Sequence, residues 1–280
     1  MFKILLKEAL NPTVTRMLID APLIAKKAKA GQFIILRVNE NGERIPLTVA
    51  GTDPEKGTVE IIYQVVGATT EELNHKEAGE YLADFVGPLG RPTELEGYKN
   101  VAVIGGGAGC AIALPEARAL HKLGARVTSI VGFRNKDLVI LEKEFLDCSD
   151  NYVRMSDDGS WGTKGLVTNA LEKLINDGEK FDCVIAIGPL IMMKFVAQLT
   201  KKYNIKTICS MNPIMIDGTG MCGCCRVMVG GKMKFACVDG PDFDGHEIDY
   251  DSAMLRNAMY RPWERHKYEE TCNLFKQEVK

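Results

Sequence analysis

Short hydrophobic runs separated by glycine and proline turns fill the first third of the chain. Residues 33–38 and 58–66 are the clearest of these runs, and both are rich in isoleucine and valine. Runs of β-branched residues bounded by turn residues are typical of β-strands. Residues 1–97 are therefore predicted to fold as a small antiparallel β-barrel.

The pattern changes near residue 98, where strand-like and helical runs begin to alternate. The runs 100–104 and 126–131 are strand-like, and the segment 114–123 between them is helical in character. A third apolar run, 183–187, ends at a Gly-Pro turn and precedes a helix that continues through residue 201. Because strands that alternate with helices pair in parallel, residues 98–210 are predicted to form an α/β domain.

Two smaller segments complete the predicted organisation. Residues 211–250 contain a cysteine-rich loop, and the charged residues 251–280 are predicted to be a helical tail packed on the surface. The fold class is thus a multidomain protein with an all-β barrel, a parallel α/β domain and a small C-terminal segment.

Composition makes this an ordinary globular protein. The 280 residues are 46% hydrophobic and 26% charged, with a formal net charge of -2, which shows no bias toward nucleic acid or membranes. No apolar run approaches the roughly 18 residues that span a bilayer, and the N-terminus passes directly into strand-like sequence. A cytoplasmic protein is expected.

Nine cysteines are present, and four of them cluster between residues 222 and 237. An odd count with such clustering argues against a disulfide framework. The five scattered cysteines are predicted to be small buried hydrophobic residues; they are Cys110, Cys148, Cys183, Cys209 and Cys272.

The cluster of cysteines is nearly an iron-sulfur ligand pattern. Plant-type ferredoxins hold a 2Fe-2S cluster with C-x4-C-x2-C and a distant fourth cysteine. Here Cys222, Cys225 and Cys237 match three of these positions, and Asp217 stands at the first. The sequence therefore predicts a 2Fe-2S cluster and a protein that transfers electrons. A zinc site is the alternative, but only one Cys-x-x-Cys pair exists and no His-x3–5-His follows it.

Two assignments within this loop stay open. Cys224 lies between two predicted ligands, so it could replace Cys225 or merely line the pocket, although the spacing favours Cys222 and Cys225. Asp217 could instead be a turn residue whose side chain accepts hydrogen bonds from the backbone that follows it.

A glycine run between the first strand and helix of the α/β domain predicts a nucleotide site. Backbone amides there and the helix N-terminus can bind a pyrophosphate at the carboxyl edge of the sheet. The Gly-Pro turn after the third strand would lie on the same edge, so the two turns could bracket one dinucleotide. A tight turn with close helix packing is the alternative. The predicted residues are Gly105, Gly106, Gly107, Gly109, Gly188 and Pro189.

The ribose end of that nucleotide is less well defined. No clear acidic residue stands about 20 positions after the glycines. Arg134 and Lys136 follow the second strand and would tolerate a 2′-phosphate, so charge does not decide between NAD and NADP. Asp158 could contact a ribose, or could belong to an exposed turn.

Two motifs in the barrel together fit a flavin. Arg44 suits a phosphate and Thr48 could reach a flavin ring, with residues 45–47 between them on the same strand. The segment 66–70 combines a strand end, a glycine turn and a threonine-capped helix start, which is a second possible pyrophosphate site. Each motif alone also suits an ordinary surface strand or turn. The flavin residues predicted here are Arg44, Ile45, Pro46, Leu47, Thr48, Val66, Gly67, Thr69 and Thr70.

With these motifs, nearly the whole chain resembles the ferredoxin-NADP reductase superfamily, in its dihydroorotate dehydrogenase electron-transfer branch. Residues 212–225 and 235–245 look more closely like the small subunits of NADH-dependent reduced ferredoxin:NADP+ oxidoreductases. These electron-bifurcating transhydrogenases are also described as sulfide dehydrogenases. Asp217 supports the closer resemblance, because the dihydroorotate branch has cysteine there.

The resemblance implies an FAD with its phosphate near Arg44 and its ring near Thr48, a nicotinamide over that ring, and a 2Fe-2S cluster beyond it. NAD(H) would exchange hydride with the flavin, with Thr48 hydrogen-bonded near the reacting nitrogen, and single electrons would pass to the cluster. A larger partner subunit with a second FAD and 4Fe-4S clusters would form a heterodimer and would interact with ferredoxin. Two departures are Ile112, where the family has proline, and Cys224, where a small residue is expected.

Two other functions stay open at this point. The chain could serve a dihydroorotate or sulfide dehydrogenase as its electron-transfer subunit. It could also be a non-catalytic nucleotide-binding module with a structural zinc. The histidines show no ligand spacing, and His246 is expected to have a surface role.

Overall fold

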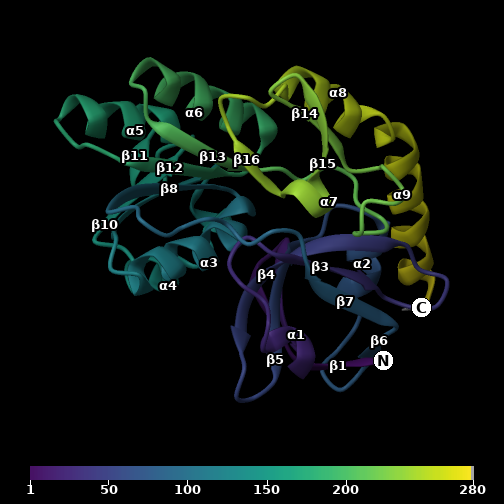
Figure 1. Ribbon diagram of the computed structural model, residues 1–280. Helices are drawn as coiled ribbons and strands as arrows, with labels where there is room; N and C mark the ends of the chain where they lie inside the picture. The colour runs from purple at the N-terminus through teal and green to yellow at the C-terminus, as the bar shows by residue number, and fades with distance from the viewer. Residues whose placement is uncertain (279–280) are drawn as a thin grey trace.

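The computed structural model describes the backbone of residues 1–278 and the side chains of residues 1–272. Figure 1 shows a barrel formed by the N-terminal part, an open sheet flanked by helices, and a C-terminal part that lies against both. The last two residues of the predicted helical tail, 279 and 280, lie outside the described residues.

The N-terminal part is a nearly closed antiparallel sheet, which confirms the predicted barrel. Its strand order is β6-β1-β2-β5-β4-β3-β7, and its ends, β6 and β7, follow one another directly in the chain. The strands are β1 (Phe2–Asn11), β2 (Val14–Asp20), β3 (Phe33–Arg37), β4 (Arg44–Asp53), β5 (Thr58–Gln64), β6 (Tyr81–Leu82) and β7 (Asp84–Leu89), with the short helices α1 (Pro22–Ala25) and α2 (Ala68–Asn74) between them.

The barrel interior is filled by large aliphatic and aromatic side chains. Ile34 and Leu36 on β3, Ile61 on β5 and Phe85 on β7 are all buried in one cluster. Along β3 and β7 these positions alternate with residues on the opposite face of the sheet, such as Ile35, which is buried in a second cluster. This is the two-residue period of a strand. The same hydrophobic runs that identified strands in the sequence therefore also form the core.

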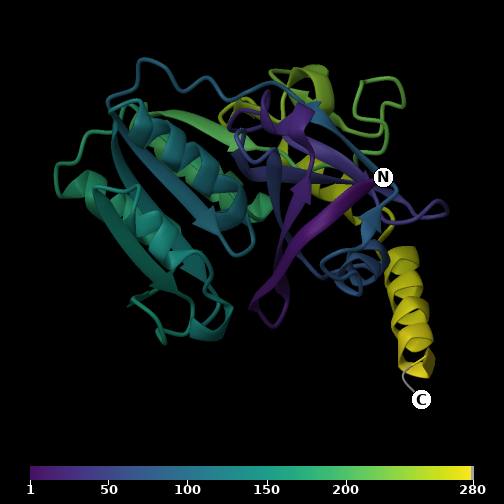
Figure 2. The same ribbon diagram turned by 90° about the horizontal axis from the view of Figure 1, so that it is seen from below.

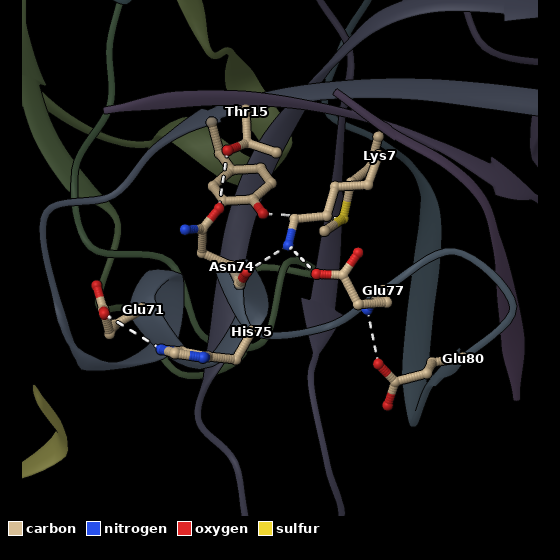
Figure 3. A network of polar contacts seen from close by, with 9 residues as sticks. Lys7, Thr15, Glu71, Asn74, His75, Glu77 and Glu80 are labelled. Carbon is tan, nitrogen blue, oxygen red and sulfur yellow. Dashed lines mark hydrogen bonds and ion pairs between the residues drawn. The ribbon is translucent and has the colours of Figure 1, made fainter. Parts of the chain in front are cut away.

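A polar network anchors α2 to the barrel (Figure 3). The Lys7 ammonium on β1 donates to the backbone oxygen of Asn74 at 2.6 Å and contacts Glu77 at 2.7 Å. Thr15 on β2 donates to the side-chain oxygen of Asn74 at 2.8 Å. The C-terminal end of α2 is thus held by two strands, which fixes the direction of the helix and of the glycine turn before it.

The second sheet has the order β11-β10-β9-β8-β12-β13-β16 and is parallel except for its last strand. Its strands are β8 (Asn100–Gly106), β9 (Arg126–Phe133), β10 (Asn151–Ser156), β11 (Thr163–Lys164), β12 (Cys183–Ile187), β13 (Lys206–Ser210) and β16 (Asp242–Asp244). Its helices are α3 (Gly109–Lys122), α4 (Glu142–Leu146), α5 (Val167–Asn176) and α6 (Leu190–Lys202), and a short 3-10 turn, η1, spans Lys136–Leu138. The predicted α/β fold is confirmed.

Helices cover both faces of this sheet (Figure 1). On β8, Val101 and Val103 pack on the side of α3, while Ala102 and Ile104 pack on the side of α5 and α6. A strand buried on both faces reads as a continuous apolar run. The order of the strands reverses direction between β8 and β12, where open α/β sheets place their ligands.

The cysteine-rich segment does not fold as an isolated loop. It contains the hairpin of β14 (Arg226–Val229) and β15 (Lys232–Phe235), then α7 (Ala236–Asp239), and ends in β16. Strand β16 pairs antiparallel with β13, with Asp242 opposite Ser210. The α/β sheet therefore receives its edge strand from a segment that the sequence did not predict to join it.

The C-terminal tail is helical as predicted and consists of α8 (Tyr250–Ala258) and α9 (Arg261–Glu278). Helix α9 packs against α2, and Figure 2 shows it on the far side of the barrel from the α/β sheet. Among the described residues, no helix is both long and apolar enough to cross a membrane. All nine cysteines are free, and four of the five scattered ones are buried, while Cys272 is partly exposed.

Phe85 provides a test of the barrel core, because its side chain is only 2% exposed whereas its neighbour Val86 on the same strand is 42% exposed. We expect Phe85→Ala to lower the free energy of unfolding by about 3–5 kcal/mol, since it removes a buried ring and leaves a cavity. Urea unfolding measures the change, and Val86→Ala is the matched control with little effect. Equal losses in both variants would contradict this assignment of the core.

Candidate functional site

A cleft of about 820 Å³ lies between the barrel and the α/β sheet. Its walls come from strands β3, β4 and β5 of the barrel, from the turns after β8, β9, β12 and β13, and from the start of the cysteine-rich segment. This volume is in the range of cofactor and ligand sites. The predicted site residues that line it are Pro46, Leu47, Thr48, Gly106, Gly107, Gly109, Arg134, Gly188 and Pro189.

The two glycine-containing turns touch each other at the edge of the sheet. A Cβ atom added at Gly109 would lie 2.5 Å from the backbone oxygen of Ile187 and 2.7 Å from the Cα atom of Gly188. One added at Gly188 would lie 3.1 Å from the backbone oxygen of Gly106. The prediction that both turns lie on one edge is confirmed, and their surface is bare backbone that a ligand can approach. Gly105 is buried at the end of β8 against Cys110, outside the cleft lining.

The residues predicted for the ribose end differ in their position. Arg134 lines the cleft, and so does Asp157, whereas Asp158 does not. The carboxylate of Asp158 accepts hydrogen bonds from the backbone N–H and the hydroxyl of Ser160, at 2.9 and 2.7 Å. The hydrogen bond from the Ser160 N–H is also the main reason that the pKa of Asp158 is lowered. Asp158 thus has the geometry of the exposed turn, and Asp157 is the acidic residue that faces the cleft.

The barrel wall of the cleft is formed around Thr48. Thr48 pairs with Phe33 across β4 and β3, and both line the cleft with Tyr63 and Gln64 of β5. Burial raises the pKa of the Tyr63 phenol above its ordinary value. The sequence did not single out Phe33, Tyr63 or Gln64, because strand residues with no distinctive spacing give no signal of a ligand wall.

Arg44 lies away from this cleft and contacts the cysteine-rich segment instead. Its Nε atom donates to the backbone oxygen of Ile216 at 2.8 Å, and its Nη1 atom lies 3.6 Å from the Asp84 carboxylate. Ile45, the next residue, packs against the barrel core. The residue predicted to hold a flavin phosphate therefore also joins β4 to the loop that begins the cluster motif.

The second predicted flavin motif, at the start of α2, forms its own hydrogen bonds. The Thr70 hydroxyl accepts from the backbone N–H groups of Val66 and Gly67, at 3.0 Å each. Thr69 is buried and its hydroxyl lies 3.4 Å from the Glu43 carboxylate. None of these residues lines the cleft. The motif is a closed helix cap that stands apart from the glycine turns of the α/β sheet.

The cluster motif combines a loop before β14 with Cys237 on α7, and it has two buried and two more accessible cysteines. The Sγ atoms of Cys225 and Cys237 are 3.2 Å apart in the interior, while Cys222 is exposed and Cys224 is partly exposed. Three thiols and a carboxylate are donors of the kind that a 2Fe-2S cluster can use, so the types of residue present fit the predicted cluster. Within the described part of the chain, no three His, Cys, Asp or Glu residues converge on a single metal ion.

The local environment treats these thiols differently. A hydrogen bond from the backbone N–H of Cys224 is the main reason that the pKa of Cys222 is lowered. The lower pKa favours the thiolate form of Cys222. Burial raises the pKa of Cys237 to about 12. Asp217 accepts hydrogen bonds from the backbone N–H of Thr219 at 2.9 Å and of Met221 at 3.3 Å. The turn geometry that was left open for Asp217 is therefore present.

Comparison with known proteins defines the class to which this fold and site belong. Residues 212–249 match the family model described as the iron-sulfur cluster binding domain of dihydroorotate dehydrogenase B. The fold is also similar to that of the structure reported for NADH-dependent reduced ferredoxin-NADP oxidoreductase in a study of flavin-based electron bifurcation. That similarity has a TM-score of 0.91 at 46% identity and covers 96% of this chain and 97% of the other. The class is that of ferredoxin-NADP reductase-like electron-transfer subunits of oxidoreductases.

Two curated relatives show the family. A dihydroorotate dehydrogenase B (NAD(+)) electron transfer subunit homolog from Thermotoga maritima is 49% identical and covers 90% of this chain and 88% of its own length. The corresponding electron transfer subunit of Streptococcus pneumoniae is 30% identical and covers 86% of this chain and 94% of its own length. The chain belongs to the family of dihydroorotate dehydrogenase B electron transfer subunits and their homologues. Family and fold support the predicted cofactor set of FAD, a 2Fe-2S cluster and NAD(H).

The contact between the two turns can be tested with Gly109→Ala. The new methyl group would press on the backbone at Ile187 and Gly188, and overpacking of this kind costs about 1–3 kcal/mol. We expect NADH to bind about tenfold more weakly or worse, since 1.4 kcal/mol corresponds to a factor of ten. Calorimetric titration measures the affinity.

Gly42→Ala is the matched control, because it adds the same methyl group in a loop where the nearest atom would be 3.3 Å away. Its affinity for NADH should equal that of the unaltered protein. Unchanged affinity in Gly109→Ala would show that the two turns do not bind the nucleotide together.

Proposed function

We propose that this chain exchanges hydride between NAD(H) and FAD and passes single electrons through a 2Fe-2S cluster to or from a larger flavoprotein subunit. The complete assembly would be an electron-bifurcating ferredoxin:NADP+ transhydrogenase. The observation that carries the proposal is that a single cleft is bounded by the barrel strand with Thr48, by both glycine turns and by the start of the cysteine-rich segment. A nicotinamide nucleotide and a flavin bound in this cleft would place the flavin between the nucleotide and the cluster.

The glycine turns would bind the pyrophosphate of NAD(H). Gly106, Gly107, Gly109 and the Gly188-Pro189 turn present backbone at the carboxyl edge of the sheet, close to the N-terminus of α3, and that end of a helix favours anions. Gly105, buried near the end of β8, would let the backbone pack closely against Cys110 behind this turn. Arg134 and Asp157 face the same cleft and would contact the ribose, with Asp158 shaping the adjoining turn.

The barrel would hold the flavin. Thr48 would donate a hydrogen bond to the ring, and Pro46 and Leu47 would pack beside it, since all three line the cleft. Arg44, with Ile45 next to it, would direct its remaining N–H groups to the flavin phosphates. The far end of the flavin site would be bounded by Val66, Gly67, Thr69 and Thr70. The bound flavin supplies the conversion between a two-electron carrier and a one-electron carrier. The protein itself positions the groups and keeps water out of the cleft.

Cys222, Cys225, Cys237 and Asp217 would hold the 2Fe-2S cluster. Asp217 would have to give up its hydrogen bonds with Thr219 and Met221 to bind an iron atom. A carboxylate oxygen is a harder ligand than a thiolate, so the reduction potential should differ from that of an all-cysteine site.

The larger partner subunit would bind beside this loop. Cys222 is exposed and Met221 next to it is 88% exposed, so the cluster would be nearest to the surface here. Ferredoxin would react with that partner and not with this chain directly. The alternative partner is a dihydroorotate dehydrogenase, which is favoured by the names of the relatives and of the family model. Isolation of the native complex and identification of its second subunit distinguishes the two.

The cofactors can be tested on freshly purified chain under anaerobic conditions. We expect one FAD and two irons for each chain, with visible absorbance that NADH bleaches much faster than NADPH, because hydride from bound NADH reduces the flavin and then the cluster. Iron and flavin analysis, absorbance and electron paramagnetic resonance measure these results. Colourless protein that contains zinc but neither iron nor flavin would instead support the nucleotide-binding module.

The choice between Cys224 and Cys225 can be tested with one serine substitution at each position. We expect Cys225→Ser to lose the cluster iron and keep its flavin, because a hydroxyl is a poor substitute for a buried thiolate ligand. Cys224→Ser should keep both irons, which makes it the matched control. The opposite result would assign the ligand to Cys224.

A further inference from the structure

A buried pair of carboxyl groups lies at the point where three parts of the chain meet. Glu116 comes from the middle of α3 and is fully buried, and Asp242 is the first residue of β16. Thr93, in the connection between the barrel and β8, lies between them. Its Oγ1 atom is 2.9 Å from Glu116 Oε1 and is also hydrogen-bonded to Asp242 Oδ2. No step of the proposed function has used these residues.

Both hydrogen bonds of Thr93 can form together only if the pair carries a proton. A hydroxyl group has one hydrogen and can donate it to only one of two carboxyl oxygens. The other carboxyl must therefore donate to the Thr93 oxygen, which it can do only when protonated. The remaining oxygens, Glu116 Oε2 and Asp242 Oδ1, are buried and have no hydrogen-bond partner.

The surroundings of the pair favour one proton over two negative charges. No Lys or Arg forms an ion pair with either carboxylate among residues 1–272. The ionisable groups that face the pair are the thiols of Cys183 on β12 and Cys209 on β13. Burial raises the pKa of Glu116 well above its ordinary value, and the neighbouring Asp242 raises it further. Burial also raises the pKa of Asp242.

The pair lies directly behind the wall of the cleft. Asp242 follows Pro241 in the chain and pairs with Ser210 across β16 and β13, and both Pro241 and Ser210 line the cleft. Because residues directly opposite in an antiparallel pair point to the same face of the sheet, the Ser210 side chain lies beside that of Asp242. A hydroxyl that lines the cleft beside the pair can pass a proton between them, since it both donates and accepts.

A proton of this kind has a use in the reaction, if the proposed function holds. A hydride consists of one proton and two electrons, so single electrons from a cluster become a hydride only when one proton joins each pair of electrons. We propose that Glu116 and Asp242 share this proton and that Ser210 conducts it between them and the cleft. In the direction of hydride formation the pair gives up its proton and is protonated again from solvent. In the reverse direction the ionised pair takes up the proton that remains after two electrons have left.

The test compares Glu116→Gln and Asp242→Asn with Glu96→Gln, which removes a carboxylate from an exposed position on the same connection. Infrared spectra of the unaltered protein at pH 7 should contain the absorption of a buried protonated carboxyl group, and the reduced-minus-oxidised difference spectrum should show that it changes. Both signals should disappear in the two variants of the pair and persist in the control. The spectrum of the unaltered protein alone is decisive if a variant fails to fold.

The rate of hydride formation gives a second measurement. In dithionite-reduced protein given NAD+, each variant of the pair should form NADH at least about tenfold more slowly at pH 8, because positioned proton donors typically contribute a factor of a hundred or more. The deficit should shrink at pH 6, where solvent supplies protons more readily. Glu96→Gln should match the unaltered protein at both values.

Stability gives a readout that needs no cofactor. A carboxyl whose pKa is raised by folding binds more protons in the folded state, so its contribution to stability is fully present below the unfolded pKa and is lost as pH rises through the folded pKa. The unfolding midpoint of the unaltered protein should therefore fall relative to that of Glu116→Gln as pH increases from 5 upward.

Absence of the carboxyl absorption at pH 7, with flavin and iron present, would overturn the proposal and leave the proposed function intact. A static absorption that is unaffected by reduction, with normal NADH formation in both variants, would also overturn it. Loss of flavin and iron from the unaltered protein would instead refute the proposed function, so the two failures are distinguishable.

Discussion

The pairing of β16 with β13 is the interaction on which the arrangement of the site depends. Through it the cysteine-rich segment becomes the edge of the α/β sheet, with Asp242 opposite Ser210. Further backbone hydrogen bonds from Met211 to Pro241 and from Arg91 to Gly240, at 2.9 and 2.7 Å, tie this segment to the sheet and to the end of the barrel. A loop attached only at its ends would have no fixed position relative to the cleft, and electron transfer needs a fixed distance.

The barrel adds a second connection of the same kind. Arg44 on β4 reaches the backbone of Ile216 and so joins the proposed flavin wall to the loop of the cluster motif. Because the guanidinium has five N–H groups in a rigid plane, one side chain can hold a backbone oxygen and still present donors elsewhere. The proposed flavin wall and the loop of the cluster motif are thus joined directly by Arg44, and not by a flexible linker alone.

Much of the fold follows from local patterns in the sequence. Strands β3, β5, β8, β9 and β12 coincide with the apolar runs that predicted them. The glycine run marks the turn after β8, because only glycine fits where Gly109 meets Ile187. The cluster motif was recognisable from spacing alone. Contacts between distant segments were not: the partner of Arg44, the pairing of β16 and the meeting of Glu116 with Asp242 depend on the tertiary arrangement. Asp157 and Asp158 are adjacent, and only the turn geometry decides which of them faces the cleft.

The position of β16 also affects how the protein folds as it is synthesised. Strands β8 to β13 can pair once residue 210 has left the ribosome, but the edge of β13 stays uncovered until residue 244 follows. An uncovered strand edge is a template for pairing with other chains, and nascent domains fold as they emerge. During that interval the growing chain exposes an open sheet edge, and completion of the cysteine-rich segment is what closes it against aggregation.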